Sequence, residues 1–389
     1  MTTRMTEPTA VDARALAPDL ARGLMLLFIA LANSHYFLRG TSVLGGYPRD
    51  GSPVDAAVTW LISTFVDGRA FPMFGLLFGY GVARIVSRQK DGTPRSVRRL
   101  LWRRSLALVV VGAPHALLLY VGDILAAYGV LLLVGAWMVR WKDRSLLLTA
   151  ALFLVLVSLP GGDSSTISTD PPDGALLPAD LLTMVVERAQ TAPYIALLGP
   201  LGFMCPFAVG LWAGRRRILE QPERHRALLR VTASVGIGAA VLGAQPVSLM
   251  LAGVVPVPDR PTQELIGPLH DATGVLGGFG YAAAVSLLAL RLGTRRGPVV
   301  DAIAATGQRS MTCYLAQSVI WTLVFTPFLL DLSGTLTVTS TALLALTTWA
   351  ATVLLAHHMH RRGHRGPFEA LARRVTYGRQ VRAERVQPS

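Results

Sequence analysis

The chain has 389 residues, of which 52% are hydrophobic and only 15% are charged, and its formal net charge is +14. Its mean hydropathy is +0.46. Soluble domains carry about 25% charged residues, so this composition excludes a soluble globular domain. Apolar runs of about 17 to 25 residues recur along the sequence, and each is long enough to cross the hydrocarbon of a bilayer as a helix. The composition therefore predicts an integral membrane protein.

Ten of these apolar runs are expected to be membrane-spanning helices. They lie near residues 20–38, 70–87, 104–121, 123–139, 145–160, 194–214, 229–254, 270–291, 309–330 and 336–358. A membrane-spanning barrel would instead show short segments of alternating hydrophobicity. The predicted fold class is therefore all-α, a polytopic helical bundle of about ten transmembrane helices.

Basic residues crowd every second connection between the predicted spans, and this pattern indicates the orientation. These basic connections are 84–104, 140–144, 215–230, 291–296 and the tail from residue 361. Loops rich in Lys and Arg face the cytoplasm, so both termini are expected there. The predicted organisation is a cytoplasmic tail (1–19), a transmembrane domain (20–358) and a basic cytoplasmic tail (359–389). We expect a multi-pass membrane protein whose partner is the lipid bilayer.

Three further interpretations are disfavoured. The arginines lie in short connections rather than on one folded basic face, so no nucleic-acid partner is expected. Residues 30–32 resemble a signal-peptide cleavage site, but the apolar run continues beyond them and removal of the segment would upset the charge alternation. Cys205 and Cys313 fall inside predicted spans and are expected to be packing residues, and no metal site is predicted.

The first predicted span carries an arginine and an asparagine eleven residues apart. Arg22 and Asn33 therefore fall on one helix face, about 16 Å apart along the axis. Either Arg22 reaches the membrane boundary beside Asp19 while Asn33 bonds a neighbouring helix, or both residues contact a substrate. His35 lies off this face or in the connection that follows.

An acid and an arginine, Asp67 and Arg69, stand at the entrance of the second predicted span. Charged side chains at such positions are costly in a membrane and usually have a partner or a function. The two residues therefore either pair with each other at the interface or bind a substrate.

Glycine pairs in the second and eighth spans have a spacing that favours close helix packing. Gly75 and Gly79 form a small-xxx-small pattern, as do Gly274 and Gly278. A nucleotide-binding loop would need a strand before the glycines and a helix after them, and that context is absent. Packing is therefore the expected role of these residues.

One histidine and one aspartate interrupt the third and fourth spans. His115 follows Pro114 eleven residues after Arg104, near mid-membrane, whereas Asp123 follows Gly122 at a hairpin expected at the outer surface. His115 is either a general base or a buried imidazole bonded between helices. Asp123 is either the acid that orients this imidazole or the N-cap of the next helix. Their spacing across a turn leaves open whether the two side chains touch.

A polar stripe follows the ninth span. Ser310, Tyr314 and Gln317 lie about one turn apart on a common face, with Arg309 just before them. Such a stripe must point into the bundle or a wet cavity, where it bonds other helices or lines a ligand site. In the second case Tyr314 and Gln317 would donate hydrogen bonds to an oxyanion. In the eighth span, Asp271 is expected to be the helix N-cap.

Several motifs, in this order, resemble the YeiB-like bacterial inner-membrane proteins, whose C-terminal half is catalogued as domain of unknown function 418. The resemblance is carried by Asp19-Leu-Ala-Arg22-Gly23 with Asn33, Phe71 to Gly81, Arg98-Arg99 through His115, Gly122 to Leu125, Gly307, Thr312, Tyr314-Leu315, Gln317-Ser318, Gly366 to Glu369 and Arg374 to Gly378. It spans nearly the whole chain and places the C-terminal family domain at roughly 220–380. Cys313 departs from the pattern, because the family usually has Asn there.

The YeiB-like family is itself similar to the transmembrane acyltransferases, a ten-helix superfamily that moves acyl groups from cytoplasmic acyl-CoA to sugars or glycans on the other side. The resemblance implies acyl-CoA as a co-substrate, no permanently bound cofactor and a small-molecule or glycan acceptor. One branch carries an Arg and a His eleven residues apart in the first span. Here those positions are Arg22 and Asn33, so His35 or His115 would have to supply the imidazole.

The leading hypothesis is therefore an acyl-CoA-dependent acyltransferase that modifies a hydroxyl or amine acceptor. Its candidate catalytic residues are His115, Asp123 and His35. Its candidate substrate-binding residues are Arg22, Asn33, Asp67, Arg69, Arg309, Tyr314 and Gln317. The alternative is a small-molecule or proton-coupled transporter without covalent chemistry, in which His115 and Asp123 form a relay. No oligomeric state is predicted.

Overall fold

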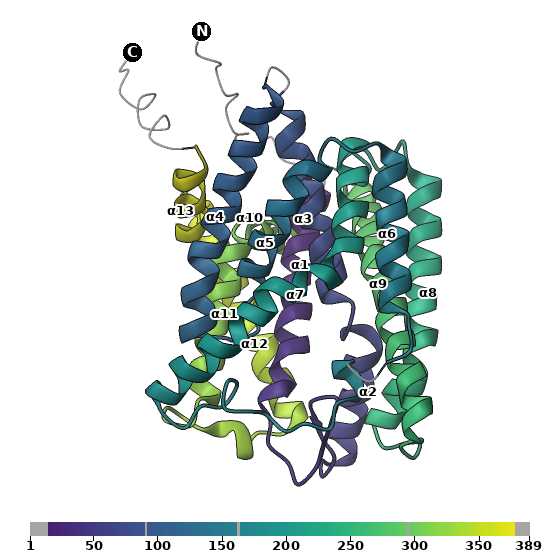
Figure 1. The fold of residues 1–389 in the computed structure, drawn as a ribbon, viewed down its shortest axis with the longest axis vertical. Helices are drawn as coiled ribbons and strands as arrows, with labels where there is room; N and C mark the ends of the chain where they lie inside the picture. Colours follow the sequence, from purple (N-terminus) through teal and green to yellow (C-terminus); the bar gives the residue numbers. More distant parts are fainter. Residues whose placement is uncertain (1–14, 90–91, 162–163, 294–295, 378–389) are drawn as a thin grey trace.

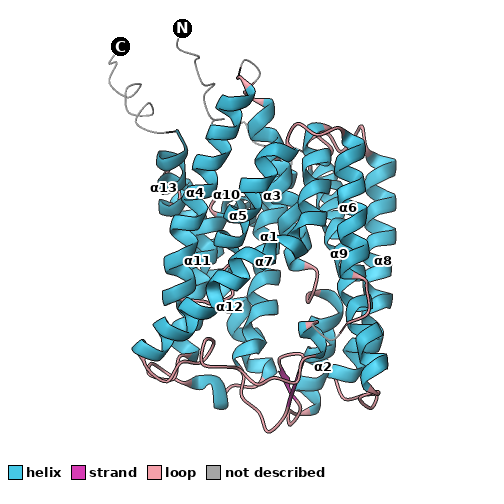
Figure 2. Ribbon diagram, viewed as in Figure 1, coloured by secondary structure: helices cyan, strands magenta, loops and turns pink. Residues whose placement is uncertain are grey.

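Long helices that run roughly side by side build the molecule (Figure 1). It is a computed structural model that describes residues 15–89, 92–161, 164–293 and 296–377. The helices are α1 (Leu16–Ser34), α2 (Pro53–Phe65), α3 (Ala70–Ser87), α4 (Pro94–Leu118), α5 (Ile124–Met138), α6 (Asp143–Val157), α7 (Leu181–Arg215), α8 (Arg226–Leu251), α9 (Arg260–Leu292), α10 (Pro298–Gln308), α11 (Ser310–Phe325), α12 (Val338–Arg361) and α13 (Pro367–Tyr377). A small antiparallel hairpin pairs β1 (Val43–Leu44) with β2 (Tyr47–Pro48) at one end (Figure 2). The predicted all-α class is confirmed.

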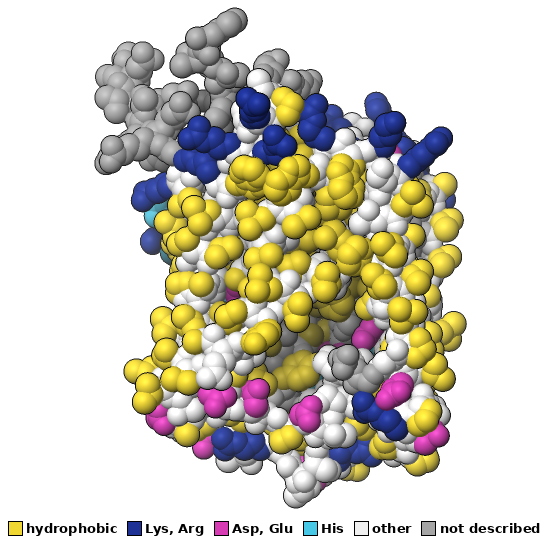
Figure 3. Space-filling view, viewed as in Figure 1, with side chains coloured by type: hydrophobic (Ala, Val, Ile, Leu, Met, Phe, Trp, Pro, Cys, Tyr) yellow, Lys and Arg dark blue, Asp and Glu magenta, His cyan; other side chains and the backbone are white. Residues whose placement is uncertain are grey.

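Side chains divide the molecular surface into three zones. Lysines and arginines gather at one end, apolar side chains form a belt around the middle, and acidic side chains collect toward the other end (Figure 3). Leu148 and Leu242 lie in outward-facing helices and are 71% and 74% exposed. Large apolar surfaces of this kind mark contact with a membrane. The basic end, with the α3–α4 and α5–α6 connections and α13, is called the arginine-rich end below, and the end with the hairpin is called the opposite end.

Six helical segments of the described chain are long and apolar enough to cross a membrane. They are residues 16–37, 53–87, 181–215, 226–251, 260–292 and 338–361. Helices α5 and α11 are apolar but have only 15 and 16 residues. A helix lies at each of the ten predicted spans, yet the total of ten crossings and the cytoplasmic placement of both termini stay predictions.

Helices α4, α7 and α9 begin ten or more residues before the predicted spans, at Pro94, Leu181 and Arg260. Helix α9 begins at Arg260, because the Asp259 side chain accepts the Thr262 amide and caps it there. Asp271 consequently lies inside α9, and its predicted N-cap role is wrong. Helix α2 was not expected, since its 13 residues are too short for a span; a capping box formed by Ser52 and Asp55 starts it.

The glycine pairs pack helices closely, as predicted. A Cβ on Gly79 of α3 would collide with the backbone carbonyl of Phe207 on α7, and one on Gly210 of α7 would collide with the carbonyl of Leu76. Gly274 and Gly278 let α9 approach the backbone of the α2–α3 turn and the start of α3 in the same way. Backbone contact at this range is available only to residues without a side chain.

We expect the Gly79→Ala substitution to lower the free energy of unfolding by about 1–3 kcal/mol, because the added methyl forces α3 away from α7. The matched control is Gly238→Ala on α8, where an added Cβ meets open space. This control should leave stability unchanged or raise it, since alanine favours helix more than glycine does. Thermal unfolding of the purified variants in detergent measures both effects. Equal melting temperatures for the two variants would contradict the packing role.

Candidate functional site

A cavity of about 1240 Å³ lies at the arginine-rich end, between α1, α3, α4, α5, α10, α11 and α13. Its described lining holds eight arginines and three carboxylates. The arginines are Arg22, Arg84, Arg88, Arg104, Arg217, Arg309, Arg365 and Arg373. Arginine recognises phosphate and carboxylate groups through several donors in a fixed plane. This excess of positive charge suits a ligand with several negative charges.

The three carboxylates of the cavity are already engaged by the protein. Asp19 accepts a hydrogen bond from Arg22 at 3.2 Å, so Arg22 lies beside Asp19, as one of its two interpretations expects. Glu220 accepts one from Nε of Arg84 at 2.7 Å. Glu369 accepts backbone and hydroxyl donors at the start of α11. The carboxylates thus hold the cavity walls together and neutralise only part of its positive charge.

The inner part of the same cavity is apolar and aromatic. Phe74 and Phe78 of α3, Leu125 and Tyr128 of α5 and Tyr314 of α11 line it. Tyr128 packs its ring against both phenylalanines, with ring centroids 4.8 Å apart in each case. The cavity therefore combines a lining rich in arginine with an apolar and aromatic lining.

His115 and Asp123 form a buried pair beside the inner end of the cavity. Nδ1 of His115 lies 2.7 Å from Oδ1 of Asp123, and the two residues are 3% and 2% exposed. The other carboxylate oxygen, Oδ2, accepts the Ala126 amide at 2.6 Å and caps α5. Asp123 therefore both contacts the His115 imidazole and caps α5, the two alternatives that the sequence left open.

The hairpin between α4 and α5 turns back inside the bundle rather than at the surface, since Tyr120, Val121 and Asp123 in it are buried. The sequence predicts Asp123 at the outer surface and His115 near mid-membrane. That separation does not occur, since the hairpin brings the two side chains into direct contact.

Four buried polar side chains have hydrogen-bonding atoms without a partner among the described residues. They are His115 (Nε2) of the pair, Tyr128 (Oη), Tyr314 (Oη) and, one turn beyond Tyr314 on α11, Gln317 (Oε1 and Nε2). The rings of His115 and Tyr314 lie 5.1 Å apart between centroids. Buried polar groups nearly always have partners, so this His115 cluster, defined by His115, Asp123, Tyr128, Tyr314 and Gln317, is suited to receive polar atoms of a ligand.

The geometry leaves one imidazole nitrogen available for chemistry. The Asp123 carboxylate accepts a hydrogen bond from Nδ1–H of His115, which leaves Nε2 as the acceptor in the neutral ring. A carboxylate in this position holds the ring in one orientation. In this tautomer Nε2 of His115 is a hydrogen-bond acceptor without a partner among the described residues.

Arg309, a predicted substrate-binding residue, has a structural task. Its guanidinium donates to the His364 carbonyl at 2.6 and 3.2 Å and to the Ala305 carbonyl at 3.1 Å. These bonds tie the break between α10 and α11 to the connection between α12 and α13. Arg309 lines the cavity, but much of its hydrogen-bonding capacity serves the fold.

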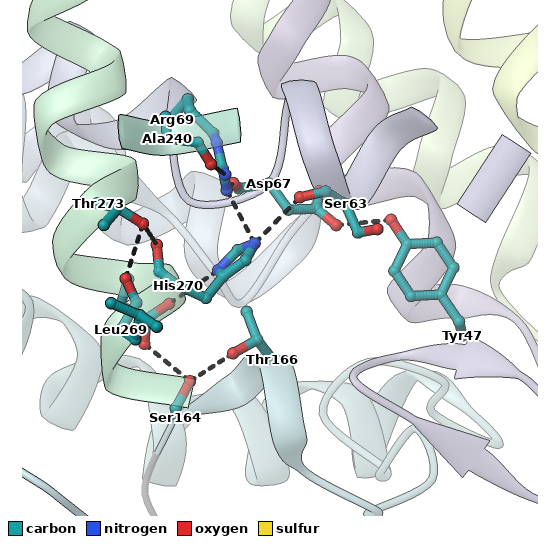
Figure 4. Close-up of polar contacts among 11 residues, drawn as sticks. Tyr47, Ser63, Asp67, Arg69, Ser164, Thr166, Ala240, Leu269, His270 and Thr273 are labelled. Carbon is teal, nitrogen blue, oxygen red and sulfur yellow. Dashed lines mark hydrogen bonds and ion pairs between the residues drawn. The ribbon is translucent and has the colours of Figure 1, made fainter. Parts of the chain in front are cut away.

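A second polar cluster lies toward the opposite end, around the fully buried Arg69 (Figure 4). The Arg69 guanidinium donates to the backbone carbonyl of Asp67 and, at 2.7 Å, to that of Ala240; it lies 2.8 Å from Nε2 of His270. These contacts join the α2–α3 turn to α8 and α9. We call Tyr47, Asp67, Arg69 and His270 the Arg69 cluster.

The remaining predicted residues are distributed around this cluster. The expected side-chain pairing of Asp67 with Arg69 is replaced by the backbone contact, because the Asp67 carboxylate accepts the Tyr47 hydroxyl at 2.6 Å. His35 stacks on the Tyr47 ring, with centroids 3.9 Å apart. Asn33 is half-buried in the last turn of α1. The fold thus brings His35 to Tyr47 of the Arg69 cluster, and His35 does not line the cavity.

Comparisons with known proteins show what the chain is similar to. Residues 213–379 match the family model described as protein of unknown function (DUF418). The chain is also 27% identical over 414 residues to the uncharacterized protein YxaH of Bacillus subtilis (strain 168), an alignment that covers 95% of this chain and 96% of YxaH. The C-terminal part of the chain, residues 213–379, is therefore similar to the DUF418 family. The matched DUF418 segment includes Arg309, Tyr314, Gln317 and Glu369, whereas His115 and Asp123 precede it.

Two residues of the site had no role in the sequence interpretation. Tyr128 lines the cavity together with Tyr314. Its position five residues after Asp123 is the sequence feature that could have indicated a place in the site. Glu369 belongs to the DUF418 segment and stood in the motif Gly366 to Glu369, but its contact with α11 joins residues 57 and 58 positions apart. A contact of that range cannot be read from helical periodicity.

We expect Asp123→Asn and Asp123→Ala to separate the two tasks of this residue. Asparagine is a good N-cap, so Asp123→Asn should keep most of the stability, whereas Asp123→Ala should lose about 1 kcal/mol more. Thermal unfolding in detergent measures the difference. If the two variants unfold at the same temperature, the capping bond to Ala126 does not stabilise α5.

Proposed function

We propose that this protein is an acyl-CoA-dependent acyltransferase of the bacterial plasma membrane. One observation carries the proposal: an arginine-lined cavity with an apolar inner end reaches Tyr314, whose ring lies against the His115–Asp123 pair. We place the arginine-rich end in the cytoplasm by the positive-inside rule. The acyl donor then comes from the cytoplasm and the acceptor, a hydroxyl or amine, from the other side.

The charge and polarity of the cavity support an acyl-CoA donor. CoA carries several phosphate charges, which suit the eight arginines, and its acyl chain is apolar, which suits Phe74, Phe78 and Leu125. Binding in this direction points the thioester toward Tyr314 and hence toward His115. Burial of the reacting atoms there excludes water, which would otherwise hydrolyse the thioester.

The proposed reaction uses His115 as general base. Nε2 takes the proton of the acceptor hydroxyl or amine while the acceptor atom attacks the thioester carbonyl carbon. Tyr314 and Gln317, with unpartnered donors, stabilise the oxyanion of the tetrahedral intermediate. When the carbon–sulfur bond breaks, the proton on Nε2 passes to the CoA sulfur. Asp123 stabilises the imidazolium between these steps.

Transport without covalent chemistry is the second candidate function. Its support is the presence of two buried clusters with ionisable groups, one around His115 and one around Arg69, toward the two ends of the bundle. Ionisable residues at such positions commonly mark proton or substrate pathways. Transport would use the same cavity but would leave the ligand chemically unchanged.

Binding of acetyl-CoA and longer acyl-CoAs to the purified protein in detergent tests the donor site. We expect a ligand-dependent rise in melting temperature, since a ligand stabilises the state that binds it. Arg22→Ala should weaken binding about tenfold, because one charge-assisted contact is lost. The matched control is Arg39→Ala, which removes an exposed arginine at the opposite end that pairs with Asp331, and it should leave the affinity unchanged.

Turnover separates the two functions. His115→Ala should retain acyl-CoA binding but lose acyl transfer by about 10²- to 10⁴-fold, because the general base is gone. His35→Ala, which alters the Arg69 cluster instead, should retain transfer. If no acyl-CoA shifts the melting temperature of the folded wild type, the acyltransferase proposal is wrong and transport becomes the favoured function.

A further inference from the structure

Helix α11 begins without a capping side chain of its own. It follows α10 directly, its first residue is Ser310, and the preceding Arg309 makes no side-chain capping bond. The first amides of a helix have no partner within the helix, so they need one from elsewhere. Here the partner comes from a helix that is far away in sequence.

That partner is Glu369 on α13. Its Oε1 accepts the Met311 and Thr312 amides at 2.8 and 3.1 Å, and its Oε2 accepts the Thr312 hydroxyl at 2.5 Å. A negative charge at a helix N-terminus is also favoured by the helix dipole. One carboxylate thus satisfies three donors in the first turn of α11.

The geometry around Glu369 is specific to this contact. A Cβ on Gly366 would collide with the Glu369 carboxylate and lie 2.5 Å from the Thr312 hydroxyl oxygen. Glycine at this position therefore leaves the space that the contact needs. The Arg309 guanidinium holds the His364 carbonyl just before it, so α13 is attached to α11 at two neighbouring points.

The capped turn leads directly into the His115 cluster. Tyr314 follows Thr312 by two residues, and Gln317 lies about one turn further along α11. Both side chains are buried, and Tyr314 lies at the inner end of the cavity against the His115 ring. A shift of the first turn of α11 would therefore move the proposed oxyanion donors relative to Nε2 of His115.

We propose that Glu369 is a positioning residue for acyl transfer: by capping α11 from α13, it fixes Tyr314 against His115 and Gln317 one turn further along α11. This inference rests on the proposed function, since it assigns Glu369 a part in the same reaction. Donor binding depends on the arginines around the cavity, whereas the rate of transfer depends on the position of α11. The loss of Glu369 thus affects turnover more than affinity.

The kinetic test compares Glu369→Ala with Glu369→Gln. A misplacement of about 1 Å costs about 10²-fold in rate, so Glu369→Ala should lower kcat by about that factor with little change in KM for acetyl-CoA. Glutamine keeps an oxygen that accepts the two amides, and Glu369→Gln should recover most of the rate. The matched control is Arg103→Ala, which removes another bond to α13, to the Val375 carbonyl, but leaves the cap intact. It should retain the wild-type kcat.

A second readout does not depend on any activity. Cys313 follows the capped residues and is buried, and Cys205 on α7 is an equally buried thiol. Glu369→Ala should expose Cys313 to a maleimide and leave the labelling of Cys205 unchanged. If Glu369→Ala does not fold, Thr312→Val, which removes one of the three bonds, should produce a smaller change in the same direction.

The two readouts distinguish failure of this inference from failure of the proposed function. Wild-type protein that labels as expected but transfers no acyl group would contradict the acyltransferase and leave the cap on α11 supported. A Glu369→Ala variant with wild-type kcat, or with Cys313 still protected, would overturn the positioning role. A fall in affinity with unchanged kcat would also overturn it, because Glu369 would then act on the ligand.

Discussion

The hydrogen bond between Nδ1 of His115 and Oδ1 of Asp123, at 2.7 Å, joins the last turn of α4 to the first turn of α5. Three features meet at this carboxylate: the start of a helix, the orientation of an imidazole and the end of a hairpin. Inside a protein such a bond is stronger than in water, and an unpaired partner would be correspondingly costly. The inner lining of the cavity depends on this hydrogen bond. Its residue Tyr128 lies on α5, which the bond joins to α4, and the ring of its residue Tyr314 lies against the His115 imidazole.

Close backbone packing supplies the frame for this site. Side chains on Gly23 and Gly307 would collide with the carbonyls of Ile303 and Asp19, so α1 and α10 pass each other at glycines. This crossing holds Arg22 on α1 next to the start of α11. The same set of helices therefore positions the arginines and the aromatic residues of the cavity. The carboxylate of Glu369 holds α11, one of these helices, in place.

Features with a local cause were predictable from the sequence, and features with a distant cause were not. The helical class, the packing of Gly75 and Gly274 and the partnership of Arg22 with Asp19 follow from hydrophobicity, residue size and charge over a few positions. Asp271 was misassigned as a cap because an aspartate near an apolar run looks the same in sequence, whether the helix starts there or eleven residues earlier at Arg260.

The candidate site was predicted in part for the same reason. His115, Asp123 and Tyr314 stood out as polar residues in apolar runs, but their meeting depends on how α4, α5 and α11 pack. His35 was grouped with them by its type, whereas the fold stacks it on Tyr47 beside the Arg69 cluster. Helix α13 and Glu369 had no sequence signal beyond a motif, because their contacts join residues more than 50 positions apart.

A structure of the protein with a thioether analogue of acetyl-CoA, which cannot transfer its acyl group, tests the assignment of the cavity most directly. The phosphates should contact the arginines of the cavity, and the thioether should lie beside Tyr314 within reach of Nε2 of His115. An analogue bound elsewhere, or with its thioether away from His115, would contradict the role given to the His115–Asp123 pair.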